Sequence, residues 1–297
     1  MAKGCSDCGH NDGDFNGCGF YRYQTCLREK GKVMSDKITL WGLRSYLLIV
    51  FVFVFAPIVT SIVFSFNSDR FPSLPLGDFT WKWYAKVYAN PDIWEAIKTS
   101  IFVAISSSVL ATIIGFCTAY TDYRYNFRFK NAYLALALLP PTIPLLILAL
   151  AMLAWLSRIG ASGQVWSIII AHTVLCAPFA MAVIRLRLQQ MNQDLESAAW
   201  NLGASEWAAM RYVVLPFTVP AIVSALCLTM AVSFDEFAIA WFVSGLTKTV
   251  PVTILEILQG NVDPQINAIG SFVFATTMTL VIVAQLFFTF KKPTVSQ

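Results

Sequence analysis

The chain has 297 residues, of which 57% are hydrophobic and only 13% are charged, and its formal net charge is +4. Soluble domains carry about 25% charged residues, so this composition excludes a soluble globular protein and indicates a membrane protein. The charges are also unevenly spread, because residues 1–44 hold twelve of the 38 charged side chains.

The first 33 residues contain four cysteines: Cys5, Cys8, Cys18 and Cys26. The first two have the spacing of half a zinc site, but the later two lack the second close pair that a zinc ribbon supplies. Met34 opens a stretch that by itself looks like a short tail followed by an apolar helix. Three interpretations of residues 1–33 therefore remain: a translated leader or misplaced start, a disordered tail, and a metal site.

Beyond this extension, the chain contains six charge-free segments of 18 to 25 residues, separated by polar connections. About 20 helical residues, at about 1.5 Å each, cross a hydrocarbon core of about 30 Å. Inside lipid every backbone hydrogen bond must be made within the element, which favours helices. We therefore predict an all-α integral membrane protein with six transmembrane helices, at residues 46–66, 101–121, 132–156, 166–184, 217–234 and 268–290.

The distribution of Lys and Arg predicts the orientation of these helices. If the N-terminal tail is cytoplasmic, the cytoplasmic side carries fifteen Lys and Arg residues and the opposite side carries six. The positive-inside rule then places both termini in the cytoplasm, with residues 293–297 as a short tail. We expect no cleavable signal sequence, because the first apolar run begins after 44 residues and is long enough to remain as an anchor.

Three prolines, Pro140, Pro141 and Pro144, interrupt the third predicted span. Proline lacks the backbone N–H, so it leaves carbonyl groups without donors, and a membrane tolerates these only beside protein or a watery cavity. The segment is therefore a candidate wall of a transport pathway. The alternative is a kink that packing alone holds in place.

The longest predicted cytoplasmic connection, residues 185–216, has the composition of a helix, a turn and a second helix. Gly203 allows a sharp turn, and Ser205 can cap the helix that follows. The first of these helices has an apolar face with helical spacing, formed by Leu195, Ala198, Ala199 and Leu202. In the cytoplasm such a face packs either on the protein's own helix ends or on another protein.

A pair of carboxylates, Asp235 and Glu236, follows the 18 charge-free residues of the fifth span. Ionisable groups at this depth usually face a cavity or a partner, because exposure to lipid costs at least about 2.5 kcal/mol each. Together with Phe234, Trp241 and Phe242, the pair would form an acidic, aromatic vestibule that attracts a cationic solute. In the alternative, one carboxylate caps a helix end or pairs with a lysine of a partner subunit.

The run Ser197-Ala198-Ala199-x-x-Leu202-Gly203, with Leu215-Pro216 downstream, resembles the EAA loop of permease subunits in binding-protein-dependent ABC importers. The position that matches the glutamate of that motif is Ser197, and Glu196 stands one place earlier. Either Glu196 takes over the role of that carboxylate or the contact is weaker here. Residues 34–292 resemble in particular the spermidine/putrescine type of permease, through matching stretches at 83–84, 90–91, 96–100, 139–144 and 262–268.

This resemblance implies a non-catalytic permease domain over residues 34–292 in a bacterial inner membrane, without cofactor or metal. It would form half of the pathway for a small solute, with a polyamine as the favoured one. The implied partners are ATPase subunits bound at residues 194–212, a second related permease, an external solute-binding protein and membrane lipid, with no nucleic acid. The chain itself has no GxxxxGK[ST] loop that could hold a nucleotide.

Two other classes of protein remain as alternatives. An ion-coupled secondary transporter or channel would predict inverted repeats and intramembrane charges, and neither is evident in the six segments. A cysteine-based membrane sensor rests on residues 5–26 alone.

Overall fold

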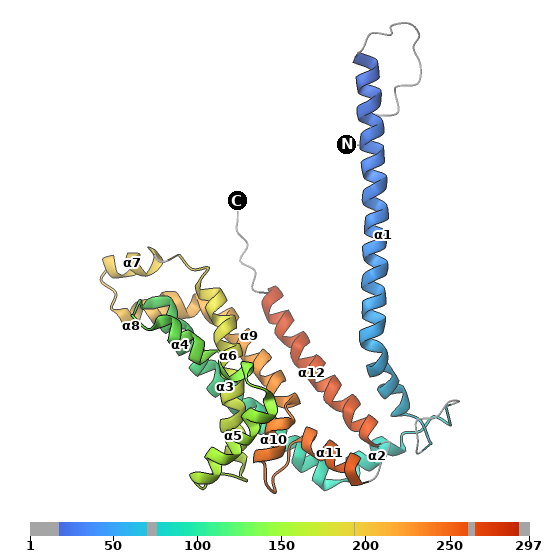
Figure 1. The fold of residues 1–297 in the computed structure, drawn as a ribbon, viewed down its shortest axis with the longest axis vertical. Coiled ribbons are helices and arrows are strands. Elements are labelled where there is room, and N and C mark those ends of the chain that lie inside the picture. The colour runs from blue at the N-terminus through green and yellow to red at the C-terminus, as the bar shows by residue number, and fades with distance from the viewer. Residues whose placement is uncertain (1–17, 70–75, 193, 261–264, 291–297) are drawn as a thin grey trace. The chain divides into compact units, whose positions relative to one another are not determined.

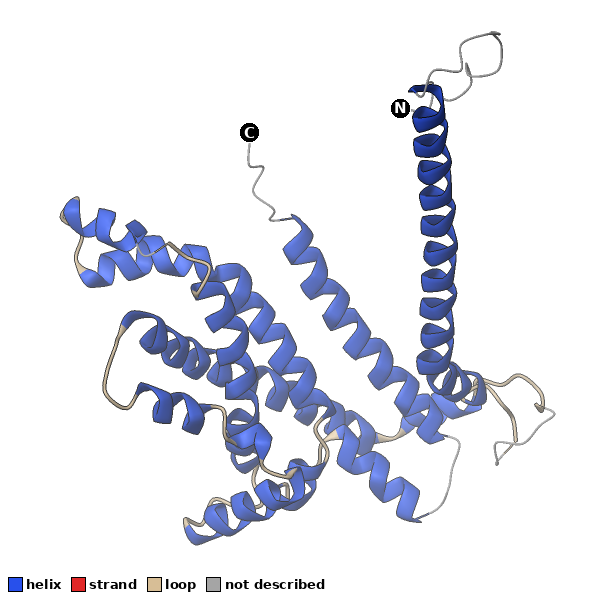
Figure 2. Cartoon of the chain, turned by 45° about the horizontal axis from the view of Figure 1, so that its top comes forward, coloured by secondary structure: helices blue, strands red, loops and turns tan. Residues whose placement is uncertain are grey.

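The computed structural model describes residues 18–69, 76–192, 194–260 and 265–290. In these residues the secondary structure is helical, apart from an isolated bridge between Asn67 and Phe79 (Figure 2). The chain divides into two units, Met1–Thr60 and Ser61–Gln297. Cys5, Cys8 and the predicted tail 293–297 lie outside the described residues.

Helix α1, Cys18–Phe64, makes up the described part of the first unit and runs four residues beyond it. The part Thr39–Phe64 is long and apolar enough to cross a membrane, and its most apolar 18-residue stretch has a mean hydropathy of 2.9. Its sequence is apolar on every face between Tyr46 and Phe55, as expected of a helix surrounded by apolar material. The first predicted span therefore lies on a long helix, which ends at Phe64.

Three long helices, α3 (Pro91–Arg124), α6 (Val165–Leu188) and α9 (Leu215–Asp235), pack against one another and form the core of the second unit (Figure 1). They contain the predicted second, fourth and fifth spans, and each is apolar and long enough to cross a membrane. The other helices include α2 (Lys82–Ala89), α10 (Ala238–Val243), α11 (Val250–Gly260) and α12 (Gln265–Phe290), and α12 contains the sixth predicted span.

Small residues allow α3 and α6 to approach closely. A Cβ atom added to Gly115 of α3 would lie 2.7 Å from the Cβ atom of Ala180 and 2.7 Å from the backbone nitrogen of Met181, both on α6. Because lipid tails are as apolar as the side chains, close backbone packing of this kind is a main source of helix association in membranes.

We therefore expect the substitution Gly115→Ala to destabilise the bundle by about 1–3 kcal/mol, because the atoms it would meet belong to a backbone and a methyl group that cannot rotate away. The measurement is the midpoint of thermal unfolding in detergent. Gly270→Ala on α12 is the matched control, since its new Cβ would lie 3.9 Å from the nearest atom, Ser61 Oγ. Equal midpoints for the two variants would contradict this packing.

Buried polar side chains also connect the three core helices. His172 Nδ1 of α6 lies 2.8 Å from Ser233 Oγ of α9, which in turn lies 2.8 Å from Ser107 Oγ of α3. Such hydrogen bonds between helices satisfy polar groups that lipid cannot.

The segment predicted as the third span is not one helix. It consists of α4 (Lys130–Ala137), a short 3-10 turn η1 (Pro140–Thr142) and α5 (Leu145–Arg158). The break follows from the three prolines, which cannot donate the hydrogen bonds that would continue α4. After the break, α5 packs against α10.

The start of the fifth span also differs from the prediction. Helix α8 (Glu206–Ala209) continues through a π-helical segment η2 (Met210–Val214) directly into α9, where the sequence suggests a separate helix that begins near Pro216. Pro216 has no N–H and its ring conflicts with the carbonyl four residues earlier. The wider π turn that precedes it accommodates both effects.

Candidate functional site

Two regions of the second unit carry the candidate functional residues. The first, which we call the hairpin, comprises α7 (Asp194–Asn201), the turn at Gly203 and α8. The second is a pocket beside η1. The hairpin lies at the end of the unit opposite to α10 and α11 (Figure 1).

The helix, turn and helix predicted for the hairpin are present. Gly203 has a φ of 87°, a left-handed conformation that L side chains rarely adopt, and the N–H of Ala204 donates to the carbonyl of Ala199. The hydroxyl of Ser205 accepts a hydrogen bond from the N–H of Ala208 at 3.2 Å and so caps α8.

The hairpin exposes large apolar side chains. Leu202 is 89% exposed, Trp207 is 68% exposed and Leu195 is 48% exposed, and Ala198 is exposed as well. Ala199 is half-buried, so most of the predicted apolar face, but not all of it, is left unpacked by the protein's own helix ends. Leu215 and Pro216, in the first turn of α9, are also exposed. The sequence analysis did not single out Trp207, although a tryptophan in the polar connection between two predicted spans can be noticed from the sequence.

Unlike these exposed side chains, the side chain of Glu196 points inward and is buried. Its Oε2 lies 3.2 Å from Nη1 of Arg124, the last residue of α3, while Oε1 is buried with no hydrogen-bond partner. The neighbouring Ser197, which matches the glutamate of the motif, is exposed. The carboxylate of Glu196, one place before the motif position, therefore forms an ion pair within the chain.

Arg124 contacts both helices of the hairpin. Besides Glu196 on α7, its Nη2 lies 3.5 Å from Oε1 of Glu206 on α8, and its guanidinium carbon lies 4.1 Å from the ring centroid of Trp200. The stacked arrangement suits a planar guanidinium, which lysine could not replace. Arg124 thus holds the hairpin on the end of α3.

The pKa of Glu196 reflects this environment. Burial raises the pKa of the carboxyl above its ordinary value, and the positive charge of Arg124 opposes the rise without cancelling it. The ionised form of Glu196 therefore depends on Arg124, since the buried carboxylate has no other ion-pair partner in the described residues.

A second buried acid forms ion pairs near the end of α3, which holds the hairpin. Asp122, two residues before Arg124, accepts a hydrogen bond from Nε of Arg185 on α6 at 2.6 Å, and Nζ of Lys130 on α4 lies 3.4 Å from its other oxygen. These pairs join the ends of three helices, α3, α4 and α6.

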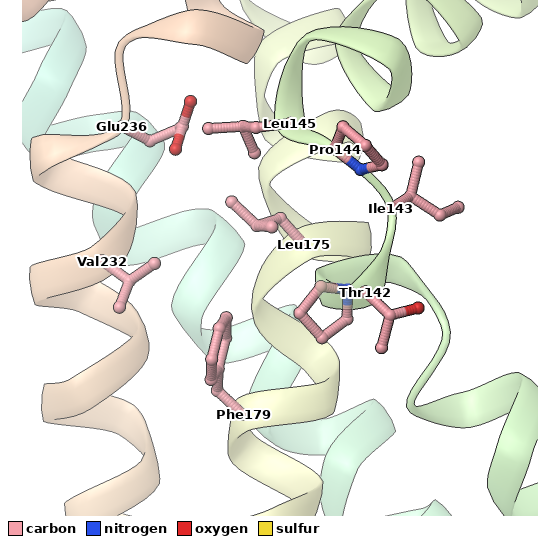
Figure 3. Close-up of a pocket in the computed structure, with 9 residues that line it drawn as sticks. Thr142, Ile143, Pro144, Leu145, Leu175, Phe179, Val232 and Glu236 are labelled. Atoms are coloured by element: carbon pink, nitrogen blue, oxygen red, sulfur yellow. The ribbon is translucent and has the colours of Figure 1, made fainter.

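The pocket lies between the broken segment, the middle of α6 and the C-terminal end of α9, and has a volume of about 490 Å³ (Figure 3). It is lined by residues from three parts of the chain: Pro141, Thr142, Ile143, Pro144 and Leu145; Leu175 and Phe179; Val232 and Glu236. The structure thus brings two of the three predicted prolines next to one of the two predicted carboxylates. Pro140 does not line the pocket.

The other predicted residues near this pocket take different positions. Asp235 is exposed at the end of α9, whereas Glu236 is only 9% exposed, and its Oε1 accepts a hydrogen bond from the N–H of Ile239 at 3.0 Å. Phe234 is 2% exposed and belongs to the core, and the half-buried Trp241 packs its ring against Phe237. A vestibule lined by all of these side chains together is therefore not formed.

Comparison with known proteins identifies the family. Residues 107–297, which contain both the hairpin and the pocket, match the family model described as "Binding-protein-dependent transport system inner membrane component". The chain belongs to this family. It is a permease subunit, and the ion-coupled transporter and the cysteine-based sensor are thereby set aside.

Curated relatives agree with this assignment. The spermidine/putrescine transport system permease protein PotC of Haemophilus influenzae is 32% identical over 244 residues, which cover 82% of this chain and 95% of the relative. The putrescine transport system permease protein PotI of Escherichia coli K12 is 30% identical over 235 residues, covering 76% of this chain and 83% of the relative.

The fold also matches solved permease structures. A chain of a bacterial ABC transporter involved in the import of the acidic polysaccharide alginate superposes with a TM-score of 0.67 at 17% identity. The match covers 87% of this chain and 98% of that chain. At this identity the likeness concerns the fold alone.

Proposed function

We propose that this permease forms half of the translocation pathway of an ATP-driven importer whose cargo is a polyamine, and that a separate ATPase subunit docks on the hairpin. The observation that carries the proposal is the hairpin itself, which buries its carboxylate against Arg124 and leaves Leu202 89% exposed. The identity with permeases of spermidine and putrescine transport systems supports the choice of cargo.

The exposed side chains of the hairpin have the chemistry of a docking surface. Leu202 and Trp207 would each contribute about 1.5–3 kcal/mol if a partner buried them fully. The chain has no phosphate-binding loop of its own, so the nucleotide would be held by that partner. Closure of two ATPase subunits on ATP would then move the hairpins and, through Arg124, the end of α3.

The topology that fits this function has six spans, of which the third is the broken segment α4–η1–α5, with residues 34–292 as the membrane domain. The excess of Lys and Arg on one side supports cytoplasmic termini and a cytoplasmic hairpin. The pocket would then face the outer half of the pathway. A second permease would complete that pathway, and an external solute-binding protein would deliver the cargo.

Purification of the tagged chain from its own cells in mild detergent tests this assignment. We expect an ATPase subunit and a second permease to co-purify, and cells that lack this chain to lose uptake of labelled putrescine or spermidine. Uptake of an unrelated neutral solute is the control. The proposal would be wrong if the chain purified without an ATPase, or if polyamine uptake persisted at the wild-type rate.

A further inference from the structure

Glu236 is a buried carboxylate that faces an open pocket and has no counter-ion among the described residues. Its side chain lines the pocket and points toward Leu145 of the opposite wall (Figure 3). None of the ion pairs formed by the described residues includes Glu236. An ionised carboxylate is costly to bury without a cation, so a positive charge bound at this place would be stabilised by Glu236.

Glu236 accepts hydrogen bonds from the backbone N–H groups of Ile239 and Ala238, and these leave acceptor positions free on the carboxylate. Oε1 accepts a hydrogen bond from the N–H of Ile239, in the first turn of α10, so Glu236 caps this helix. The sequence left open whether one of the two carboxylates has this role. An ionised carboxylate has two oxygens with about four acceptor positions, so it can cap a helix and still bind a cation. Asp235, the adjacent acid, is exposed and does not line the pocket.

The other walls of the pocket suit the rest of a polyamine. Leu175, Val232 and Leu145 offer apolar surface for methylene groups, and Phe179 offers an aromatic ring, whose face attracts cations. Pro141 and Pro144 have no N–H, so these two positions of the wall offer no backbone donor to an anion. The volume, about 490 Å³, lies in the range of pockets that bind small molecules.

From this geometry we infer that the pocket binds one ammonium end of an aliphatic polyamine on its way through the pathway, with Glu236 as the counter-ion. The inference rests on the proposed function, because it takes the cargo to be a polyamine. It also separates the two acids, since Glu236 binds the cargo and Asp235 does not.

The test is the variant Glu236→Gln in the complete transporter, reconstituted in vesicles with its partner subunits. Glutamine keeps an oxygen that can accept from the N–H of Ile239 but removes the charge. We expect the spermidine concentration for half-maximal uptake to rise by at least about tenfold, because a charged hydrogen bond is lost. Asp235→Asn should have a much smaller effect. Glu95→Gln, at an exposed position on α3, is the matched control and should leave uptake unchanged.

Three outcomes would overturn the inference, and they can be told apart. An unchanged half-maximal concentration in Glu236→Gln, with normal uptake by the wild type, overturns the inference alone. Loss of the second permease from the purified Glu236→Gln variant, so that no transporter assembles, shows that Glu236 pairs with a lysine or arginine of the partner subunit instead. Absence of spermidine and putrescine uptake by the wild-type transporter overturns the proposed cargo and the inference together.

Discussion

Replacing Arg124 by glutamate should abolish ATP-driven uptake while the membrane helices still insert. The substitution removes the guanidinium that lies 3.2 Å from the buried carboxylate of Glu196 and places a second negative charge beside it. Removal of one partner from a buried pair costs about 3–5 kcal/mol, and the stacking on Trp200 is lost as well. The hairpin would then no longer be held on α3, so ATP hydrolysis by the complex would continue without uptake.

Two further variants show whether the effect belongs to this contact. Arg128→Glu makes the same change of charge at an exposed position four residues later and should leave uptake nearly unchanged. The double variant Arg124→Glu with Glu196→Arg reverses the pair and should recover part of the uptake. A double variant as inactive as Arg124→Glu, together with an equal loss in Arg128→Glu, would show that Arg124 acts only through general charge or folding.

Replacing Leu202 by aspartate should release the ATPase from the purified complex. Leu202 is 89% exposed, so the permease itself loses no core contact and should remain folded. In a docked complex the change removes a buried leucine and buries a charge, which together should weaken binding by at least about a hundredfold. The measurement is the amount of ATPase retained on the tagged permease after washing.

The matched control for this change is Leu246→Asp. Leu246 is 96% exposed and lies on the connection between α10 and α11, at the end of the unit opposite to the hairpin. This variant should retain the ATPase at the wild-type amount. Full retention of the ATPase by Leu202→Asp would contradict the docking role of the hairpin.

The long helices and the hairpin could be predicted because their signals are local. Uninterrupted apolar segments predicted the long helices α1, α3, α6, α9 and α12, and the first four of these contain stretches that are long and apolar enough to cross a membrane. Gly203 and Ser205 identified the turn and the cap of α8, since each acts on the backbone within a few residues. The prolines in the third segment likewise indicated a break, although not its division into two helices and a turn.

The contacts between distant residues in the hairpin and the pocket could not be predicted from such local signals. Arg124 and Glu196 stand 72 residues apart, and nothing in either neighbourhood indicates the other. The roles of Asp235 and Glu236 also depend on where α9 ends, because adjacent residues on a helix point about 100° apart. The helix ends at Asp235, so the chain turns there and directs Glu236 into the pocket.

The central claim is that this chain couples transport to ATP hydrolysis by a separate ATPase subunit. The accumulation of labelled spermidine in reconstituted vesicles tests this claim most directly. We expect no accumulation with the two permeases and the solute-binding protein alone. Accumulation against the gradient should begin only when the ATPase subunit and ATP are added. Uphill accumulation by the purified chain in the absence of any ATPase would contradict the account.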